Sequence, residues 1–244
     1  SSKIEILDTS DFKKVGTLSG FTSPRYFIGI NSGKAYVTDL FGKGIWVVDL
    51  VSGNILKKIK IFGWTEEIIL VGKKVFVASM ENDFLYVINS ETDRVQDSIK
   101  IGFGTTGLVM DKENFLWAFC GGESSKGLLA GIYKVDPIND TVIKKFPFPK
   151  QSDYPSKVKM NAEKDTLYFL NGSLYVLSVY SSTLPTLPII TASSTNNFYG
   201  LGIHPQTGEI YLADAGDYSQ KGTTLIYSKQ AQLLHSFKCG YIPN

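Results

Sequence analysis

Short apolar segments with an aromatic residue near the centre recur along the chain at intervals of roughly forty residues. Their central aromatics are Tyr36, Phe76, Trp117, Tyr168 and Tyr211. The segments themselves cover residues 34–39, 74–79, 115–120, 166–171 and 209–214. Their content of β-branched and aromatic residues favours strands. A spacing this regular indicates a repeated structural unit.

Three further segments complete each unit. An apolar segment that closes on Asp, Asn or Ser follows, at 4–8, 45–49, 85–89, 132–136, 174–178 and 224–228. Such closing residues accept hydrogen bonds from the next turn, and a strand with period-two alternation comes after it, as in 55–61 and 95–101. Another apolar strand opens each unit, at 26–30, 67–71, 107–110, 157–160 and 199–203.

Four strands in each unit, without any helical period, predict an all-β fold, a β-propeller of four-stranded antiparallel blades. We expect a single domain over 1–244, with about five and a half blades of a seven-bladed type. The predicted division is a half blade at 1–20, full blades at 21–62, 63–101, 102–149, 150–190 and 191–239, and the start of a ring-closing strand at 240–244. An open ring would expose two sheet edges, so we expect roughly 70 further N-terminal residues and a processed or truncated start at Ser1.

Composition narrows the function. A hydrophobic fraction of 43% and a charged fraction of 20% are typical of a folded chain. The net charge is only +2, so no basic surface suited to nucleic acid is expected. No apolar stretch reaches the ~18 residues needed to span a membrane. Cys120 and Cys239 lie in different repeats, and we expect two buried free thiols.

Four motifs carry a family resemblance. The strand Lys34–Asp39 resembles the YVTN-repeat propellers. Together with the segment 4–8, the lead-in Ser23–Tyr26 and the segment Gly63–Glu67, it resembles in particular the seven-bladed YncE-like (DUF5074) cell-surface propellers of Bacteroides and relatives. The resemblance covers the whole chain. It implies export to the cell surface or periplasm with a lipid anchor. One branch of the family captures corrinoids (vitamin B12) for a TonB-dependent transporter, and no binding residue is carried over from it.

Loop lengths place a binding surface on one face. The loops that follow the second strand of each unit share a face with those that precede the first strand, and their lengths vary from 171–173 to 120–131. Variable loops on a rigid scaffold are typical of a binding surface.

Aromatic residues gather on that predicted face. Phe21, Trp64, Phe103 and Tyr241 each follow a glycine, and Tyr154 and Tyr199 lie nearby. They would form either a platform for a planar or sugar ligand or wedges between blades. The polar candidates are Arg25, Glu66, Glu81, Asn82, Glu123, Lys126, Asn197, Asp214, Asp217 and Tyr218.

We expect a non-enzymatic binding protein without a cofactor or metal. The sequence places His204 in a turn of the opposite face and His235 on an outer strand. We therefore expect no catalytic triad and no histidine-ligated metal on the predicted binding face. The family resemblance makes a corrinoid the first candidate ligand, with an outer-membrane transporter as partner. A glycan- or protein-binding scaffold is the alternative, followed by a lactonase- or glycosidase-type hydrolase that uses carboxylate pairs such as Glu66 and Glu67.

Overall fold

The computed structural model describes residues 2–244, which form β-strands joined by turns and one 3₁₀ turn, η1 (Ser124–Lys126). A hairpin comes first, β1 (Lys3–Leu7) and β2 (Lys14–Ser19), followed by five sheets. Blade 1 is β3 (Pro24–Asn31), β4 (Lys34–Asp39), β5 (Gly44–Asp49) and β6 (Ile55–Lys60). Blade 2 is β7 (Thr65–Val71), β8 (Lys74–Ser79), β9 (Phe84–Asn89) and β10 (Arg94–Lys100).

The remaining three sheets follow the same order. Blade 3 is β11 (Thr105–Met110), β12 (Leu116–Cys120), β13 (Gly131–Asp136) and β14 (Thr141–Pro147). Blade 4 is β15 (Ser156–Met160), β16 (Thr166–Asn171) and β17 (Ser173–Ser178). Blade 5 is β18 (Phe198–Ile203), β19 (Ile210–Asp214), β20 (Lys221–Tyr227) and β21 (Leu233–Tyr241).

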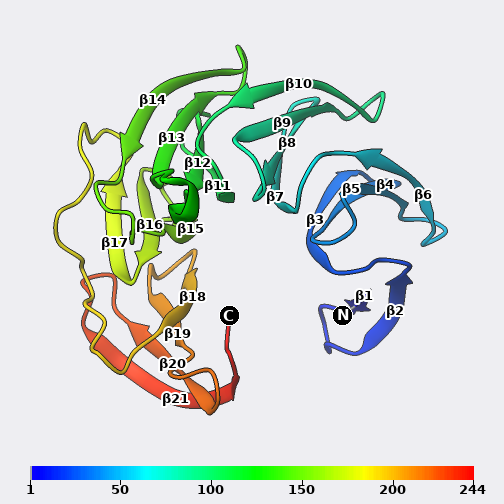
Figure 1. Ribbon diagram of the computed structural model, residues 1–244. Helices are drawn as coiled ribbons and strands as arrows, with labels where there is room; N and C mark the ends of the chain where they lie inside the picture. Colours follow the sequence, from blue (N-terminus) through cyan, green and yellow to red (C-terminus); the bar gives the residue numbers. More distant parts are fainter. Residues whose placement is uncertain (1) are drawn as a thin grey trace.

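The blades follow one another around an open arc, and the two chain ends face each other across the opening (Figure 1). Each blade is a meander of sequential antiparallel strands. The first strands of successive blades, from β3 to β18, lie next to one another and form the inner wall. The predicted all-β propeller is therefore confirmed, and the seven-bladed ring stays a prediction.

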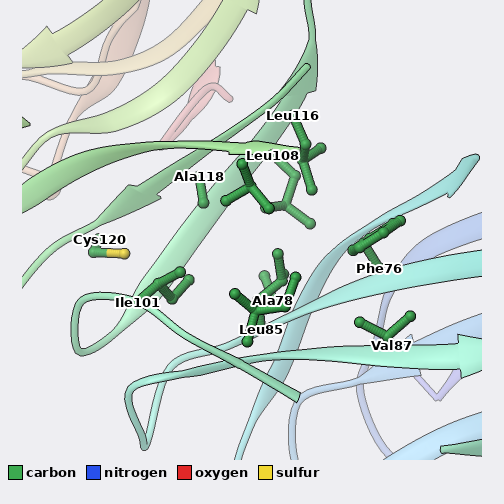
Figure 2. Close-up of a cluster of buried hydrophobic side chains, with 11 residues drawn as sticks. Phe76, Ala78, Leu85, Val87, Ile101, Leu108, Leu116, Ala118 and Cys120 are labelled. Atoms are coloured by element: carbon green, nitrogen blue, oxygen red, sulfur yellow. The ribbon is translucent and has the colours of Figure 1, made fainter. Parts of the chain in front are cut away.

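The hydrophobic core lies between blades rather than within one of them. Alternate residues of β8 face opposite neighbours: Val75 and Val77 pack with blade 1, whereas Phe76 and Ala78 pack with blade 3. Figure 2 shows the second of these layers, in which Phe76 and Ala78 meet Leu108 and other residues of blade 3. Because side chains alternate across a strand, a central strand that is buried on both faces reads as a continuous apolar run.

Blade 4 departs from the prediction of a fourth strand within 150–190. Its sheet has three strands, and beyond β17 the chain makes only an isolated bridge between Leu174 and Ile190. Pro185 and Pro188 fall in the segment where an outer strand would run. Proline lacks a backbone N–H and cannot donate to a strand ladder, which accounts for the irregular chain here.

The predicted start of a new strand at 240–244 is also wrong at its first residues. β21 continues to Tyr241, which pairs with Lys221 of β20. The next residues turn toward the inner wall, where the Asn244 side chain accepts a hydrogen bond from Lys157 at 2.8 Å. Both cysteines are free thiols, but only Cys120 is fully buried, and burial raises its pKa to about 12. Cys239 on β21 is partly exposed, contrary to the expectation.

Within residues 2–244, no helix has the length and hydrophobicity needed to cross a membrane.

Candidate functional site

Two cavities lie where the inner wall meets the loops that join neighbouring strands. The channel cavity, about 840 Å³, is lined by residues of all five inner strands, among them Arg25, Glu66, Thr106, Lys157 and Tyr199. The loop cavity, about 770 Å³, is lined by loop residues of blades 2 to 4, namely Phe62, Trp64, Met80, Glu81, Phe103, Gly104, Gly121, Gly122, Glu123, Ser124, Lys126, Gln151, Ser152, Asp153 and Tyr154. Both cavities share Met80, Ser152 and Tyr154, so they form one mouth.

A β-bulge near the start of every inner strand shapes the channel cavity. The strand register shifts between Pro24 and Phe27 in β3, and at the corresponding place in β7, β11, β15 and β18. In each strand the residue after the first regular pair lines the cavity: Arg25, Glu66, Thr106, Lys157 and Tyr199. A bulge adds a residue and re-aims its side chain. Equivalent positions of the five inner strands therefore place five different types of side chain in one cavity.

An ion pair between blades 1 and 2 lies at this bulge level. The Arg25 Nε donates to the Glu66 carboxylate, at 3.1 Å from Oε1 and 3.3 Å from Oε2. The Glu66 side chain is 6% exposed, whereas Arg25 is 40% exposed. Burial raises the pKa of Glu66, and the charge and hydrogen bond of Arg25 offset this only in part. Glu66 is thus a buried carboxylate with a single side-chain partner.

Its neighbour Glu67 has a different partner. The Glu67 Oε2 accepts a hydrogen bond from the backbone N–H of Leu108 at 2.9 Å, which joins blade 2 to blade 3. Burial raises the pKa of Glu67, and this hydrogen bond partly counters the rise. The two carboxylates therefore contact different blades, Glu66 blade 1 and Glu67 blade 3.

Lys157 lines the channel cavity but is absent from the candidates chosen on the sequence. It lies in the bulge of β15 with φ +54°, in the left-handed region that non-glycine residues seldom adopt. Its ammonium lies 4.9 Å from the centroid of the Tyr199 ring and 2.8 Å from the Asn244 Oδ1. Burial lowers the pKa of Lys157, and the nearby positive charge of Arg25 lowers it further. The one sequence signal would have been its alignment with Arg25 and Glu66 at the start of an inner strand.

Aromatic side chains connect the two cavities. Tyr154 lines both, is 49% exposed, and lies so close to Gly121 that a Cβ there would be 2.3 Å from its ring. Trp64 is 36% exposed and meets Phe41 edge to face at 5.7 Å. Tyr199 meets Tyr218 in the same way, also at 5.7 Å. Exposed aromatic surface beside a cavity suits a planar or sugar ligand.

The four aromatic residues that each follow a glycine, Phe21, Trp64, Phe103 and Tyr241, have different surroundings, although the sequence places them at matching positions of the repeat. Phe21 lies three residues before its inner strand and packs in the core with Leu18, Val37 and Val48. Phe103 lies two residues before β11 and lines the loop cavity, where Lys126 covers its ring at 4.4 Å. Tyr241 belongs to β21 and lines neither cavity. The wedge interpretation therefore holds for Phe21, and Trp64 and Phe103 belong to the mouth.

Some polar candidates stabilise loops instead of facing a cavity. Asn82 donates to the Phe62 carbonyl and the Ser79 and Tyr86 hydroxyls. Asp214 is buried and accepts from the Asn197 and Gly216 backbone and the Asn196 side chain; burial alone would raise its pKa, but these bonds hold it below its usual value.

Other polar candidates divide between loop and cavity. Asp217 accepts from the backbone of its own loop and lines neither cavity. Glu123 lines the loop cavity and also caps η1 through the Ser125 N–H. Glu81 and Lys126 line the loop cavity, while Asn197 and Tyr218 line the channel cavity with Arg25 and Glu66.

Both histidines lie away from the cavities. His204 accepts from the Gln206 and Thr207 N–H groups in the turn between β18 and β19, and His235 is on the outer strand β21. Over residues 2–244, His, Cys, Asp and Glu form no cluster of three that would hold a metal ion.

Comparison with known proteins places the chain in a family. The family described as "Domain of unknown function (DUF5074)" matches residues 3–232. The chain belongs to the DUF5074 family. No curated protein matches the chain. The YncE-like and YVTN names, and an origin in Bacteroides, stay predictions.

Two solved structures share the fold. Hydrazine synthase of Kuenenia stuttgartiensis has a TM-score of 0.73 at 16% identity, with 92% of this chain and 70% of that chain covered. A quinoprotein alcohol dehydrogenase-like protein of Bacteroides thetaiotaomicron has a TM-score of 0.76 at 18% identity, with 97% and 60% covered. Identities this low show the propeller fold alone.

Proposed function

We propose that this DUF5074 propeller is a non-enzymatic capture protein that holds a large amphipathic ligand across the channel and loop cavities. The observation that carries the proposal is the shared mouth: two adjoining cavities with exposed aromatic rings in both and with polar groups at fixed positions. Apolar and aromatic walls with a few oriented polar groups are typical of ligand sites. Export to the cell surface or periplasm on a lipid anchor, and delivery to an outer-membrane transporter, are part of this proposal.

A corrinoid is the first ligand to test. The family resemblance suggests it, and its broad ring needs a platform wider than one cavity. Trp64 in the loop cavity, Tyr154 between the cavities and Tyr199 in the channel cavity supply three aromatic surfaces over that width. Sugars also stack on aromatic rings, so glycans form the second group of ligands in the same test.

Isothermal titration calorimetry with cobalamin, followed by a glycan panel, tests the proposal. We expect a dissociation constant of about 1 µM or tighter for the true ligand. Trp64→Ala and Tyr199→Ala should each weaken binding about tenfold, the loss of one stacked ring. Tyr180→Ala removes an aromatic that is 60% exposed and lines neither cavity, and should leave binding unchanged. Absence of heat with cobalamin removes the corrinoid, and absence with glycans too leaves a scaffold for protein contacts.

A hydrolase screen tests the enzymatic alternative. Lactones and glycosides should be left intact, because Glu66 and Glu67 have partners in different blades and Asp214 and Asp217 bind backbone N–H groups. Hydrolysis that is abolished by Glu66→Gln or Asp217→Asn would establish an enzyme instead.

A further inference from the structure

Charge is unevenly divided between the two cavities. The loop cavity contains Glu81, Glu123 and Asp153 against a single cation, Lys126. The channel cavity contains three cations, Arg25, Lys157 and Lys159, against Glu66 and Glu67. The part of the mouth that lies on the inner strands is therefore the more positive one.

The two carboxylates of the channel cavity already have partners. Glu66 accepts from the Arg25 Nε, and Glu67 accepts from the Leu108 N–H. Three of their four oxygens therefore already accept hydrogen bonds from the protein, which reduces their capacity to attract a cationic ligand.

The cations, by contrast, retain donors. Within residues 2–244, Arg25 donates only through Nε, so both of its Nη groups are left for a ligand. The end of a guanidinium that carries two Nη groups matches the two oxygens of a carboxylate or phosphate. Glu66 fixes the guanidinium from the Nε side, and the arginine is thereby oriented before a ligand arrives.

Lys157 supplies a second donor in the same cavity. Its ammonium makes one hydrogen bond in the part of the chain that the structure describes, to Asn244, and the ring of Tyr199 lies beside it. It occupies the bulge position that Arg25 occupies in β3, so both cations are presented at one level of the inner wall.

We propose that the channel cavity binds a carboxylate or phosphate group of the captured ligand, held by the two Nη groups of Arg25 and by the ammonium of Lys157. This inference rests on the proposed function for the existence of a ligand and adds the chemical class of the group that is recognised. The apolar part of the ligand then lies over Tyr154 toward Trp64.

Three matched sugars test this in the full chain. Glucose is neutral, glucuronate carries a carboxylate at the same carbon, and glucose 6-phosphate carries a phosphate there. Nuclear magnetic resonance titration should show saturable shifts of the Arg25 Nε–H and the Lys157 backbone amide with one or both anions, and none with glucose. Binding to glucuronate alone identifies a carboxylate, and binding to glucose 6-phosphate alone identifies a phosphate.

The variants separate charge recognition from folding. Removing Arg25 alone would leave Glu66 buried without its partner, so the comparison is made in a Glu66→Gln background. Arg25→Gln in that background should weaken anion binding at least about tenfold, and Lys157→Gln severalfold. Lys60→Gln removes one exposed positive charge on β6 and should have no effect.

Failures are distinguishable. Equal shifts with glucose and glucuronate, no saturable shift with either anion, or unchanged anion affinity after Arg25→Gln overturns the anion site. If the calorimetric ligand still binds the double variant with unchanged affinity, the anion site fails while capture at the mouth stands. If both anions bind but neither cobalamin nor any glycan does, the capture function fails while the anion site stands.

Discussion

Ion pairs at two carboxylates of blade 2, Glu66 and Asp93, join it to blade 1, and the two carboxylates differ in how many donors they have. At the mouth, Glu66 of β7 accepts, among the described residues 2–244, only from the Arg25 Nε. At the turn between β9 and β10, Asp93 accepts from the ammonium groups of Lys34 at 2.7 Å and Lys57 at 2.9 Å, and from the Tyr36 hydroxyl. Both side chains are nearly buried, at 6% and 10% exposure.

The pKa values of these two carboxyl groups move in opposite directions. Burial acts to raise both. For Asp93, the hydrogen bonds from Lys34, Tyr36 and Lys57 outweigh burial and hold its pKa below the usual value. For Glu66, Arg25 does not outweigh burial, and the pKa is raised. Asp93 has more donors and is less strongly desolvated than Glu66, and these two differences together set the opposite signs. The Asp93 turn links blades 1 and 2 through three donors, whereas the proposed anion site at the mouth requires that Arg25 keep donors beyond its bond to Glu66.

The largest expected effect comes from Asp93→Asn. The change keeps the shape and the left-handed backbone at this residue (φ +54°) but leaves two cations without their carboxylate. We expect a loss of about 3 kcal/mol in the free energy of unfolding, measured with urea. Glu91→Gln, in a pair whose side chains are 73% and 58% exposed, is the control and should change little. Similar losses for both would contradict the distinction.

Acid titration of the same variant sharpens the result. A carboxyl group with a lowered folded-state pKa stabilises the fold above its unfolded pKa of about 3.9, and this stabilisation is lost as the pH falls through the folded value. The stability difference between wild type and Asp93→Asn should therefore shrink below about pH 4. A difference that is constant with pH would show that the charge of Asp93 has no part in it.

The next largest loss of stability is expected from removing the Tyr36 hydroxyl, which has no counterpart in blade 2. Lys74 bonds Asp140 of blade 3 as Lys34 bonds Asp93, but Phe76 replaces Tyr36, and the Asp140 Oδ1 is buried without a partner. Tyr36→Phe should cost about 1–2 kcal/mol in unfolding free energy, because it removes a donor to a buried carboxylate.

Phe76→Tyr is the reciprocal change. A hydroxyl at this position would supply the donor that Asp140 lacks, and we expect a gain of about 1 kcal/mol in urea unfolding. In the Asp140→Asn background, where the carboxylate charge is absent, the gain should diminish. An equal gain there would mean that the new hydroxyl has another partner.

A smaller effect is expected from Glu66→Gln. Replacing a buried, weakly satisfied charge by a neutral side chain should change stability by less than about 1 kcal/mol near neutral pH. A raised folded-state pKa destabilises the fold as the pH rises from about 4.3 through the folded value, so Glu66→Gln should gain stability relative to wild type over that rise. Relative to wild type, Asp93→Asn should instead lose stability as the pH rises. If the two variants showed the same pH dependence, the contrast between Glu66 and Asp93 would be contradicted.

The smallest change is expected for Lys57→Ala. The Lys57 side chain is 50% exposed, so water replaces most of its interaction with Asp93, and the loss should stay below about 0.5 kcal/mol. A loss close to that of Asp93→Asn would assign the cohesion of this turn to Lys57 rather than to the partly buried Lys34 and the buried Tyr36.

The sequence by itself determined the blade. The predicted strands at 34–39, 74–79 and 166–171 coincide with β4, β8 and β16. The two-residue alternation of apolar side chains and the Asp, Asn and Gly residues of the turns are local signals. They predict strands and turns without any information about which blades pack together. The prolines in the fourth blade were also visible, although the regular repeat obscured their effect on an outer strand.

Only the tertiary structure decided which side chains meet. Phe21 and Trp64 both follow a glycine, yet one is core and the other lines a cavity, because each starts at a different distance from its inner strand. Lys157 appears as one lysine among several until the bulges align it with Arg25 and Glu66. Glu66 and Asp93 are both acidic residues in the sequence, and their pKa values are separated by burial and by donors from the neighbouring blade, which are properties of the assembled blades.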